Sequence, residues 1–385
     1  MAEEPRQRPF RRALVIAVVA VAVATGVFVL ANRQDDAPLA NSTGAANTAP
    51  PVTTEPPAPP APPSTPQPQP GAAALPAAPG KALDDWAAKY STWLEIPQRS
   101  MLAYAKATIT MSQEQPECHV SWVTLAGIGK NATDHGRAGG GVIHEDGRPA
   151  QPIGTVELLD FNGTVVSELD ANGPMQLTPA VWDQWARSAS GAGAPDPQNL
   201  DDAALTAARA LCADGRDLSD GPTWWNAVSS LQDAPLFLHR VLATANVYGT
   251  VAKTDAPPKT SVLKAVYFAI EKIGLPYVWG GNGIEGGHEG FDCSGLTTAA
   301  YGNAGITLKR TAHWQYGSVP LVPVAEEPQL GDLVFFGNPS TKIHHVGIYV
   351  GNKQMVDAPT FGQAVQVHAY RRPGDDYAGA GRPAV

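Results

Sequence analysis

The side chain best suited to nucleophilic chemistry in this 385-residue sequence is a cysteine at the start of a run of small residues. Cys293 follows Asp292 and precedes Ser294 and Gly295. The run from Cys293 to about Ala304 predicts a helix whose N-cap is Asp292. A cysteine in a first helical turn lies at the positive end of the helix dipole, which favours the thiolate that attacks carbonyl groups. Cys293 is therefore the candidate nucleophile.

A thiolate nucleophile needs a base within hydrogen-bond reach and a third group that orients the base. His345 lies in the expected strand 344–350, and residues 355–358 form the expected returning strand after a turn at 351–353. Positions 345 and 357 are symmetric about Gly351, so a tight hairpin places them within about one residue of being cross-strand partners. Asp357 could then orient the His345 ring and fix its tautomer.

A lone cysteine is more often a small core residue than a catalyst, but a series of motifs supports the catalytic interpretation. In order and spacing, the motifs over about residues 261–375 closely resemble the NlpC/P60 family of cell-wall cysteine peptidases. The motifs are Pro276-Tyr277-Val278-Trp279-Gly280-Gly281, Asp292-Cys293-Ser294-Gly295-Leu296, Arg310-Thr311 with Gln315, Gly331-Asp332-Leu333-Val334-Phe335-Phe336, and His345-Val346-Gly347-Ile348-Tyr349.

The resemblance implies an α+β, papain-like domain with Cys293 as nucleophile and His345 as base. It implies that Tyr277 helps to shape the oxyanion region, and that the enzyme cleaves between D-glutamate and diaminopimelate in the stem peptide. We expect Asp292, Ser294 and Trp279 to contact substrate. One position departs from the family, whose third polar residue is usually His, Glu, Gln or Asn. Asp357 stands there and is one methylene shorter than glutamate.

The preceding region, about residues 81–250, has mostly helical patterning. It predicts helices over Val120–Ile128, Thr178–Ala189, Leu200–Cys212 and Ala234–Val247. Cys118 and Cys212 fall in this same region, so we expect them to form a disulfide that leaves Cys293 free. The alternative is that all three cysteines are buried free thiols.

This helical region resembles the lysozyme-like lytic transglycosylase domains of bacteria, a likeness that also supports the Cys118–Cys212 pair. The motifs that carry it are Ile96-Pro97, Ser121-Trp122, Leu125-Ala126-Gly127-Ile128-Gly129, Asp134-His135-Gly136, Gly173-Pro174-Met175-Gln176-Leu177-Thr178-Pro179, and residues 196–204. Such enzymes use one glutamic acid as general acid and base, but alanine stands at the matching position, Ala132. A Tyr-Asn pair of the family is replaced by Leu231-Gln232.

Without the glutamic acid, the usual cleavage of the glycan strand has no proton donor. We therefore expect a glycan-binding groove without transglycosylase activity, which Met175 and Gln176 could line. The alternative is a displaced acid, with Glu145, Glu157, Asp160 and Glu168 as candidates, and the ordinary interpretation of each is a solvated carboxylate.

The N-terminal segment has the pattern of a membrane anchor. Residues 13–31 are uncharged and almost all aliphatic, and they would span roughly 28 Å as a helix, close to the ~30 Å hydrocarbon core. Four arginines lie within residues 1–12, which keeps that end in the cytoplasm and sends the rest of the chain outside. A cleaved signal peptide is the alternative, although its apolar region is usually shorter. Residues 37–80 hold 14 prolines and one charged side chain, Glu55, and predict an extended spacer.

Composition limits the remaining possibilities. The net charge of -9 argues against a nucleic-acid-binding protein. No cluster of His, Cys and Asp has zinc-ligand spacing, and thiol chemistry needs no cofactor, so we expect neither metal nor organic cofactor. The expected partners are peptidoglycan and, through one helix, the cytoplasmic membrane.

The sequence therefore predicts a multidomain, single-pass, membrane-anchored peptidoglycan hydrolase with its C-terminal domains facing the cell wall. Two alternatives remain open for the whole protein: a non-catalytic wall-binding scaffold, and a bifunctional hydrolase with a displaced transglycosylase acid. A third is another thiol acyl-transfer enzyme, because the same triad fits several amide substrates. The expected segments are a cytoplasmic tail (1–12), a transmembrane helix (13–31), a Pro/Ala-rich linker (32–80), a lysozyme-like domain (81–250), a linker (251–260) and a peptidase domain (261–385).

Overall fold

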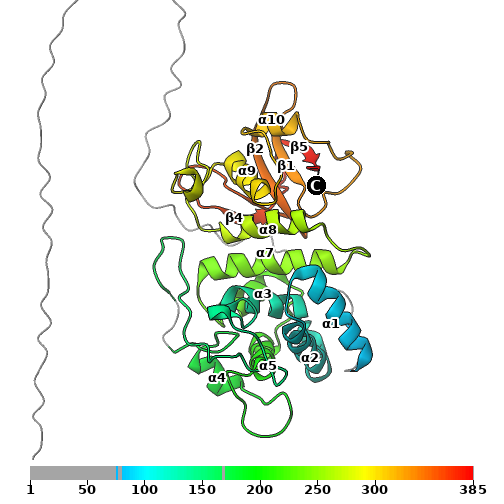
Figure 1. Ribbon diagram of the computed structural model, residues 1–385, viewed down its shortest axis with the longest axis vertical. Helices are drawn as coiled ribbons and strands as arrows, with labels where there is room; N and C mark the ends of the chain where they lie inside the picture. Colours follow the sequence, from blue (N-terminus) through cyan, green and yellow to red (C-terminus); the bar gives the residue numbers. More distant parts are fainter. Residues whose placement is uncertain (1–74, 77–79, 167–169, 385) are drawn as a thin grey trace, which may run out of the picture. The chain divides into compact units, whose positions relative to one another are not determined.

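The computed structural model describes residues 75–76, 80–166 and 170–384, which form a helical half followed by an antiparallel sheet with three further helices (Figure 1). The helical half contains α1 (Lys81–Leu94), α2 (Gln98–Glu114), α3 (Trp122–Thr133), α4 (Pro179–Trp185), α5 (Leu200–Leu211), α6 (Gly221–Ser229) and α7 (Pro235–Ala252). The C-terminal half contains α8 (Thr260–Glu271), α9 (Cys293–Asn303), α10 (Ala312–Tyr316), β1 (Leu333–Asn338), β2 (Lys342–Gly351), β3 (Gln354–Asp357), β4 (Gln366–Ala369) and β5 (Tyr377–Gly381).

Helix α7 is the central helix of the helical half. Fifteen of its 18 residues are buried, which is the pattern of a helix enclosed on almost every side. It packs against α3, where Gly127 allows the two backbones to approach closely. A Cβ atom at Gly127 would lie only 3.1 Å from the Val241 carbonyl oxygen, so a larger residue there would push the helices apart.

The four expected helices are present, with different ends. The helix expected over Val120–Ile128 is α3, which starts later because the Ser121 side chain caps it. The helix expected over Ala234–Val247 continues to Ala252 as α7. The helix expected over Thr178–Ala189 is α4 and ends at Trp185. That expectation was four residues too long, because the Ala189 N–H donates to the Asp202 carboxylate (2.7 Å) and not to a helical carbonyl.

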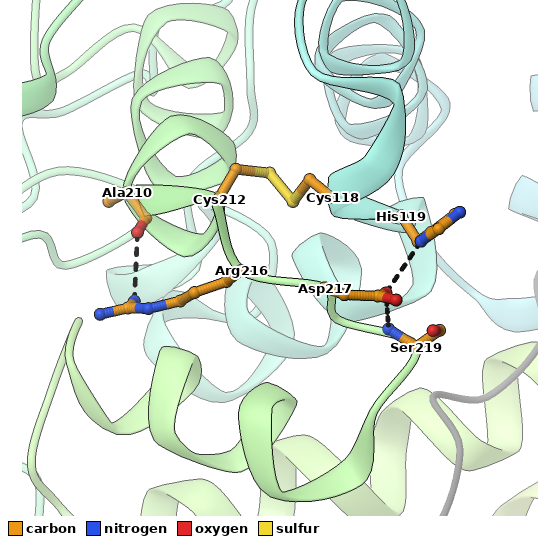
Figure 2. Close-up of a disulfide and its surroundings, with 7 residues drawn as sticks. All are labelled: Cys118, His119, Ala210, Cys212, Arg216, Asp217 and Ser219. Carbon is orange, nitrogen blue, oxygen red and sulfur yellow. Dashed lines mark hydrogen bonds and ion pairs between the residues drawn. A yellow bond between two sulfur atoms is a disulfide. The ribbon is translucent and has the colours of Figure 1, made fainter. Parts of the chain in front are cut away.

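The expected disulfide joins Cys118 to Cys212 (Figure 2). It links the turn after α2 to the C-terminal end of α5, with Cα atoms 5.5 Å apart and a separation of 94 residues. Next to it, His119 contacts the Asp217 carboxylate (2.8 Å), which also accepts a hydrogen bond from the Ser219 N–H (2.9 Å). In the chain-entropy account, closing a loop of this length stabilises the fold by about 4–5 kcal/mol. Cys293 is the free thiol.

The five strands form one antiparallel sheet in the order β4-β3-β2-β1-β5. Strands β2 and β3 are joined by a tight turn in which Asn352 and Lys353 have φ values of 49° and 58°. Two successive residues with positive φ are typical of the turns that join hairpins. Helices α8 and α9 pack on β2 and β3, so the helix that starts at Cys293 lies against the strand that carries His345.

The register of the β2–β3 hairpin differs from the symmetric one expected from sequence. Ile348 faces Val356, and a register shift follows between Tyr349 and Gly351. Continuing this pairing places Asp357 opposite Gly347, two residues from His345, whereas the sequence predicted a difference of about one residue at most. The physical reason is the position of the turn: its central residues are Asn352 and Lys353, so the hairpin is centred beyond Gly351. Because a shift of two residues keeps the same face, Asp357 still lies on the face of His345.

The two halves contact each other through α7, which packs on β2, β3 and β4. The buried Asn246 side chain of α7 donates a hydrogen bond to the Gln354 side chain of β3 (2.8 Å). Buried apolar residues of both halves, including Val247 and Val350, belong to one continuous core cluster. The expected boundary at 251–260 remains a prediction, and the segment between α7 and α8 runs over residues 253–259.

In the part of the chain that the structure describes, no helix is both long enough and apolar enough to cross a membrane. The expected transmembrane helix (13–31) lies outside the described residues, as do the cytoplasmic tail (1–12) and residues 32–74 of the linker.

Candidate active site

The candidate nucleophile, Cys293, is the first residue of α9 and is buried. The expected cap is present: the Asp292 carboxylate accepts a hydrogen bond from the Gly295 N–H (2.6 Å). The same carboxylate accepts from the Gly280 N–H (3.0 Å) and forms a bidentate pair with the Arg310 guanidinium (2.9 and 2.8 Å). Asp292 therefore holds three separate segments together at the start of the nucleophile helix.

Ser294 belongs to the same network. Its hydroxyl donates to Asp292 (3.2 Å) and accepts from Arg310 (3.0 Å), and the residue is buried. Asp292 and Ser294 are thus engaged with neighbouring protein groups and stand directly beside Cys293. Their expected contact with substrate remains a prediction.

The candidate base, His345, lies on β2 with its side chain largely buried. Its Nε2 atom is 2.6 Å from the Asp357 carboxylate. The Cys293 sulfur lies 4.0 Å from the carbonyl oxygen of the adjacent His344. Burial by itself would lower the pKa of His345. The hydrogen bond to Asp357 and the interaction with Cys293 outweigh burial and raise that pKa to about 10. The three candidate residues from separate parts of the sequence therefore lie together in one interacting set.

The ring of His345 has a defined orientation. An ionised carboxylate can only accept, so the proton between Asp357 and His345 is on Nε2. The other ring nitrogen, Nδ1, is then the atom available to the thiol. Because the bond to Asp357 fixes this tautomer, Nδ1 can exchange a proton with Cys293. The adjacent His344 was expected on the opposite face, but it is the extra residue of a β-bulge, which interrupts strand alternation. It lines the same cleft as His345, and its Nε2 contacts Asp376 at the surface (2.7 Å).

Asp357 is almost completely buried and accepts a second hydrogen bond that the sequence did not predict. His368 of β4 approaches the other carboxylate oxygen through its Nε2 atom (2.8 Å). Burial by itself would raise the pKa of Asp357. The two imidazoles, His368 and His345, hold it well below its usual range, so the buried carboxyl group is ionised.

Tyr277 and Cys293 both line a cleft of about 510 Å³. Burial and the neighbouring Cys293 raise the pKa of Tyr277 to about 12, so its phenol is protonated at neutral pH and can donate a hydrogen bond. The Trp279 ring is 62 % exposed and stacks on Phe361, with ring centroids 6.3 Å apart. Phe361 also contacts the Tyr277 ring (5.1 Å), which links the exposed Trp279 to the edge of the cleft.

The cleft has a polar rim beyond the reactive residues. Gln363, Gln366, Arg372, Asp375 and Asp376 all line it. The rim thus offers a cation, two carboxylates and two amides to a substrate next to the thiol. In the described part of the chain, no group of three or more His, Cys, Asp or Glu side chains is arranged to hold a metal ion.

In the helical half, Met175 and Gln176 are both buried. The Gln176 side chain accepts from the Val156 N–H (2.7 Å) and donates to the carbonyl oxygens of Gly154 (2.8 Å) and Gly173 (2.9 Å). Gln176 therefore fastens a loop to the helical core with its amide fully used. Its expected contact with glycan, like that of Met175, remains a prediction.

A separate cleft of about 370 Å³ lies near these residues and includes Thr178, Trp185, Arg216, Gln232 and Asp233 in its lining. The buried Gln232 amide donates to the Gln176 carbonyl oxygen (2.8 Å), which connects the cleft to the Met175-Gln176 segment.

Ala132 is buried, and none of the proposed replacement acids lines this cleft. Glu145 and Glu157 are exposed, Asp160 accepts the Asn162 and Thr164 N–H groups of its own turn, and Glu168 lies outside the described residues.

Comparison with known proteins places these observations in a family. A family model described as the NlpC/P60 family matches residues 274–377. The chain is 30% identical over 220 residues to the peptidoglycan endopeptidase RipB of Mycobacterium tuberculosis, and the match covers 52% of this chain and 84% of RipB. It is 47% identical over 92 residues to the bifunctional muramidase/DL-endopeptidase CwlT of Bacillus subtilis, covering 23% of this chain and 27% of CwlT.

A probable endopeptidase p60 of Listeria seeligeri is 50% identical over 90 residues, covering 23% of this chain and 16% of p60. The chain thus spans about a quarter or less of the length of CwlT and p60, and most of RipB. Among solved structures, an NlpC/P60 family protein from Bacillus cereus is 34% identical, with a TM-score of 0.30 and coverage of 33% of this chain and 41% of that one.

Proposed function

Because this chain belongs to the NlpC/P60 family, we propose that it is a cysteine endopeptidase that cuts the peptide part of peptidoglycan. The observation that carries the proposal is the set of Cys293, His345 and Asp357 at the edge of an open cleft, in which His345 is hydrogen-bonded to Asp357 and interacts with Cys293. RipB, CwlT and p60 are each named as endopeptidases, which supports the same reaction class.

In the proposed reaction, the Cys293 thiolate attacks the carbonyl carbon of the scissile amide. Tyr277 donates a hydrogen bond to the developing oxyanion. The carbon–nitrogen bond then breaks, and the proton on His345 Nδ1 passes to the leaving amine. Water attacks the resulting thioester while Nδ1 takes its proton, which expels the Cys293 thiolate, releases the acid product and restores the thiolate–imidazolium pair. Asp357 stays ionised throughout and only orients the ring.

The proposed substrate is the stem peptide, cleaved between D-glutamate and diaminopimelate. Diaminopimelate carries an amino group and a carboxylate on its side chain, which are complementary to the carboxylates and the guanidinium of the cleft rim. Trp279, exposed beside the cleft, would contact the neighbouring part of the substrate.

For the helical half we propose glycan binding without transglycosylase activity. Its support is the buried Ala132, at the position where the lytic transglycosylases that this half resembles carry their glutamic acid, together with the polar cleft that contains Trp185, Arg216 and Asp233. An indole surrounded by polar side chains suits a sugar, which has both apolar faces and hydroxyl groups. For the N-terminal segment, residues 13–31 would anchor the chain in the cytoplasmic membrane and residues 32–80 would let both halves reach the wall.

Digestion of purified peptidoglycan by the full chain tests the peptidase proposal, with Cys293→Ala as the inactive control. We expect the wild-type chain to release peptides with a new diaminopimelate amino terminus from diaminopimelate-type wall, leaving D-glutamate on the glycan strand, and Cys293→Ala to release none. Lysine-type wall, which lacks the side-chain carboxylate, should be cut more slowly. Equal release by both chains would leave a non-catalytic scaffold as the better account.

Binding to glycan strands stripped of their peptides tests the helical half. We expect the Cys293→Ala chain to sediment with these strands, and the further change Trp185→Ala to weaken sedimentation. The matched control is Trp314→Ala, which removes an exposed indole from the C-terminal half. New anhydro-muramic ends after incubation with the wild-type chain would contradict the inactive transglycosylase proposal and favour a displaced acid.

A further inference from the structure

The carboxylate of Asp357 is held by two imidazoles, and only one of them belongs to the nucleophile–base pair. His345 bonds one oxygen (2.6 Å) and His368 bonds the other (2.8 Å). In the β3–β4 ladder, Met355 pairs with His368 and Asp357 pairs with Gln366. His368 is therefore the diagonal neighbour of Asp357 on the same face of the sheet, the position from which a long side chain reaches across.

The hydrogen bonds determine which nitrogen of His368 carries the proton. The ionised Asp357 can only accept, so Nε2 of His368 donates. The Nδ1 atom of His368 lies 3.1 Å from an Arg372 guanidinium nitrogen, which can only donate. Nδ1 therefore accepts, and the ring is neutral. The Ala369 carbonyl oxygen also lies 3.1 Å from Nδ1, but a proton placed there to bond it would face the guanidinium charge.

A second histidine lies behind β4. His239 of α7 is close to His368 and fully buried against the edges of Phe161 and Trp225. Burial lowers the pKa of His239 to about 4. His239 is thus uncharged at neutral pH and adds no positive charge behind the β4 strand.

Because its side chain is short, Asp357 needs His368 as a second hydrogen-bond partner. Asp357 reaches the His345 ring diagonally, past Gly347, where a Cβ atom would lie 3.2 Å from the Asp357 Cβ. With one oxygen on His345, the other oxygen would be buried and unpaired without His368, a costly arrangement that rotation of the carboxylate would relieve. That rotation would withdraw the oxygen that orients the His345 ring.

We propose that His368 is a positioning residue of the active site: in its neutral form, with Nδ1 held by Arg372, it fixes the Asp357 carboxylate against His345. Only the expected effect on kcat rests on the proposed peptidase function. The orientation of the His345 ring beside Cys293 can be measured without any substrate.

The first test is the rate at which iodoacetamide alkylates Cys293 in the full chain at pH 7, without reductant. Cys118 and Cys212 are paired, so a single adduct reports on Cys293. We compare wild type, His368→Phe, which removes the donor, and His368→Gln, whose amide can replace Nε2–H. The matched control is His119→Phe, which removes an exposed histidine that contacts an aspartate far from the sheet.

We expect His368→Phe to slow alkylation about tenfold or more, because the base loses its orientation. His368→Gln should recover most of the rate, and His119→Phe should match wild type. With a stem-peptide substrate, kcat should fall in the same order while KM stays unchanged. An unaltered rate in His368→Phe would overturn the proposal. Slowed alkylation in a chain that cleaves no stem peptide would refute the peptidase function and leave this inference standing.

If His368→Phe does not fold, as judged by circular dichroism, the tautomer of His368 in the wild-type chain tests the proposal instead. Nitrogen-15 NMR of the imidazoles, with the His368 signals identified by their absence in His368→Gln, should show protonated Nε2 and bare Nδ1 at pH 7. A proton on Nδ1 would refute the proposal.

Discussion

At the scale of single residues, the site consists of one buried carboxylate surrounded by groups that need its charge. Asp357 is ionised, orients two imidazole rings and has almost no contact with water. An unpaired buried charge would be unstable, so the two histidines stabilise the carboxylate as much as it orients them. The direction of each pKa shift follows from this arrangement, with the Asp357 pKa lowered and the His345 pKa raised.

Removing only the charge of Asp357 should reduce catalysis strongly. Asp357→Asn keeps the shape of the side chain but replaces one accepting oxygen by an NH₂ group, which donates. The proton on His345 Nε2 is then no longer favoured. We expect kcat for stem-peptide cleavage to fall by about 10²- to 10⁴-fold with little change in KM. Steady-state kinetics of the folded variant measures this. Full activity in Asp357→Asn would mean that the carboxylate does not orient the base.

The raised pKa of His345 also predicts how stability depends on pH. Protonated His345 is favoured in the folded chain, with a pKa of about 10 compared with 6.5 for the free side chain. Its stabilising contribution is therefore fully present below pH 6.5 and is lost as pH rises toward 10. Thermal unfolding of wild type and His345→Gln should show a difference in Tm that shrinks across this window. A difference that grows with pH would contradict the raised pKa.

The sequence identified most of this site because its residues lie in local motifs. Asp292 and Cys293 begin one helix, and His345 and Asp357 belong to one hairpin, so short-range spacing sufficed. His368 was missed because the loop of residues 358–365 separates β3 from β4, and no spacing rule fixes the register across it. The signal available in the sequence was the alternation of valines with Gln366 and His368, which is typical of a strand with one polar face.

At the scale of elements, side chains outside a helix or strand determined the ends that periodicity could not predict. Asp202 of α5 binds the backbone N–H groups of Ala189 and Asp196, so α4 ends before Ala189. The β2–β3 turn is centred on Asn352 and Lys353, so counting symmetrically about Gly351 predicted the wrong register. Existence and type of these elements followed from local patterns, while their ends and register depended on partners distant in sequence.

The disulfide joins two elements whose packing also makes up the helical core, so its loss should weaken that half. Replacing both Cys118 and Cys212 by alanine avoids a new free thiol, and we expect it to lower the free energy of unfolding by about 2–5 kcal/mol. Guanidinium unfolding followed by tryptophan fluorescence measures the change. Cys293→Ala, which leaves the disulfide intact, is the control. An unchanged midpoint in the double variant would show that the bridge adds no stability.

At the scale of the whole molecule, the described residues form a helical half and a sheet half that share α7. The sequence predicted both halves from their different patterns, but nothing in those patterns predicted that the sheet packs on a helix of the other half. Once the structure is known, the composition of helix α7 explains this contact. The helix has apolar residues on almost every side because it packs against α3 as well as the sheet.

The buried Asn246–Gln354 hydrogen bond between α7 and β3 offers a test of whether the halves unfold together. Asn246→Leu removes the donor and leaves a buried Gln354 oxygen without it, which should cost about 1–3 kcal/mol. Changing both residues to leucine removes the polar pair altogether, and because an apolar pair of similar shape can be nearly neutral, the double variant should recover part of the loss.

Two probes report on the two halves during this unfolding. Far-ultraviolet circular dichroism follows the helices, and loss of the fast alkylation of Cys293, which needs the oriented base, follows unfolding of the sheet half. If α7 is a shared core element, both probes give the same guanidinium midpoint in wild type, and Asn246→Leu lowers both midpoints together. If only the alkylation midpoint moved, the sheet half would be unfolding by itself. The contact through α7 would then be a docking of two independent units, and orientation of the base by Asp357 would not depend on the helical half.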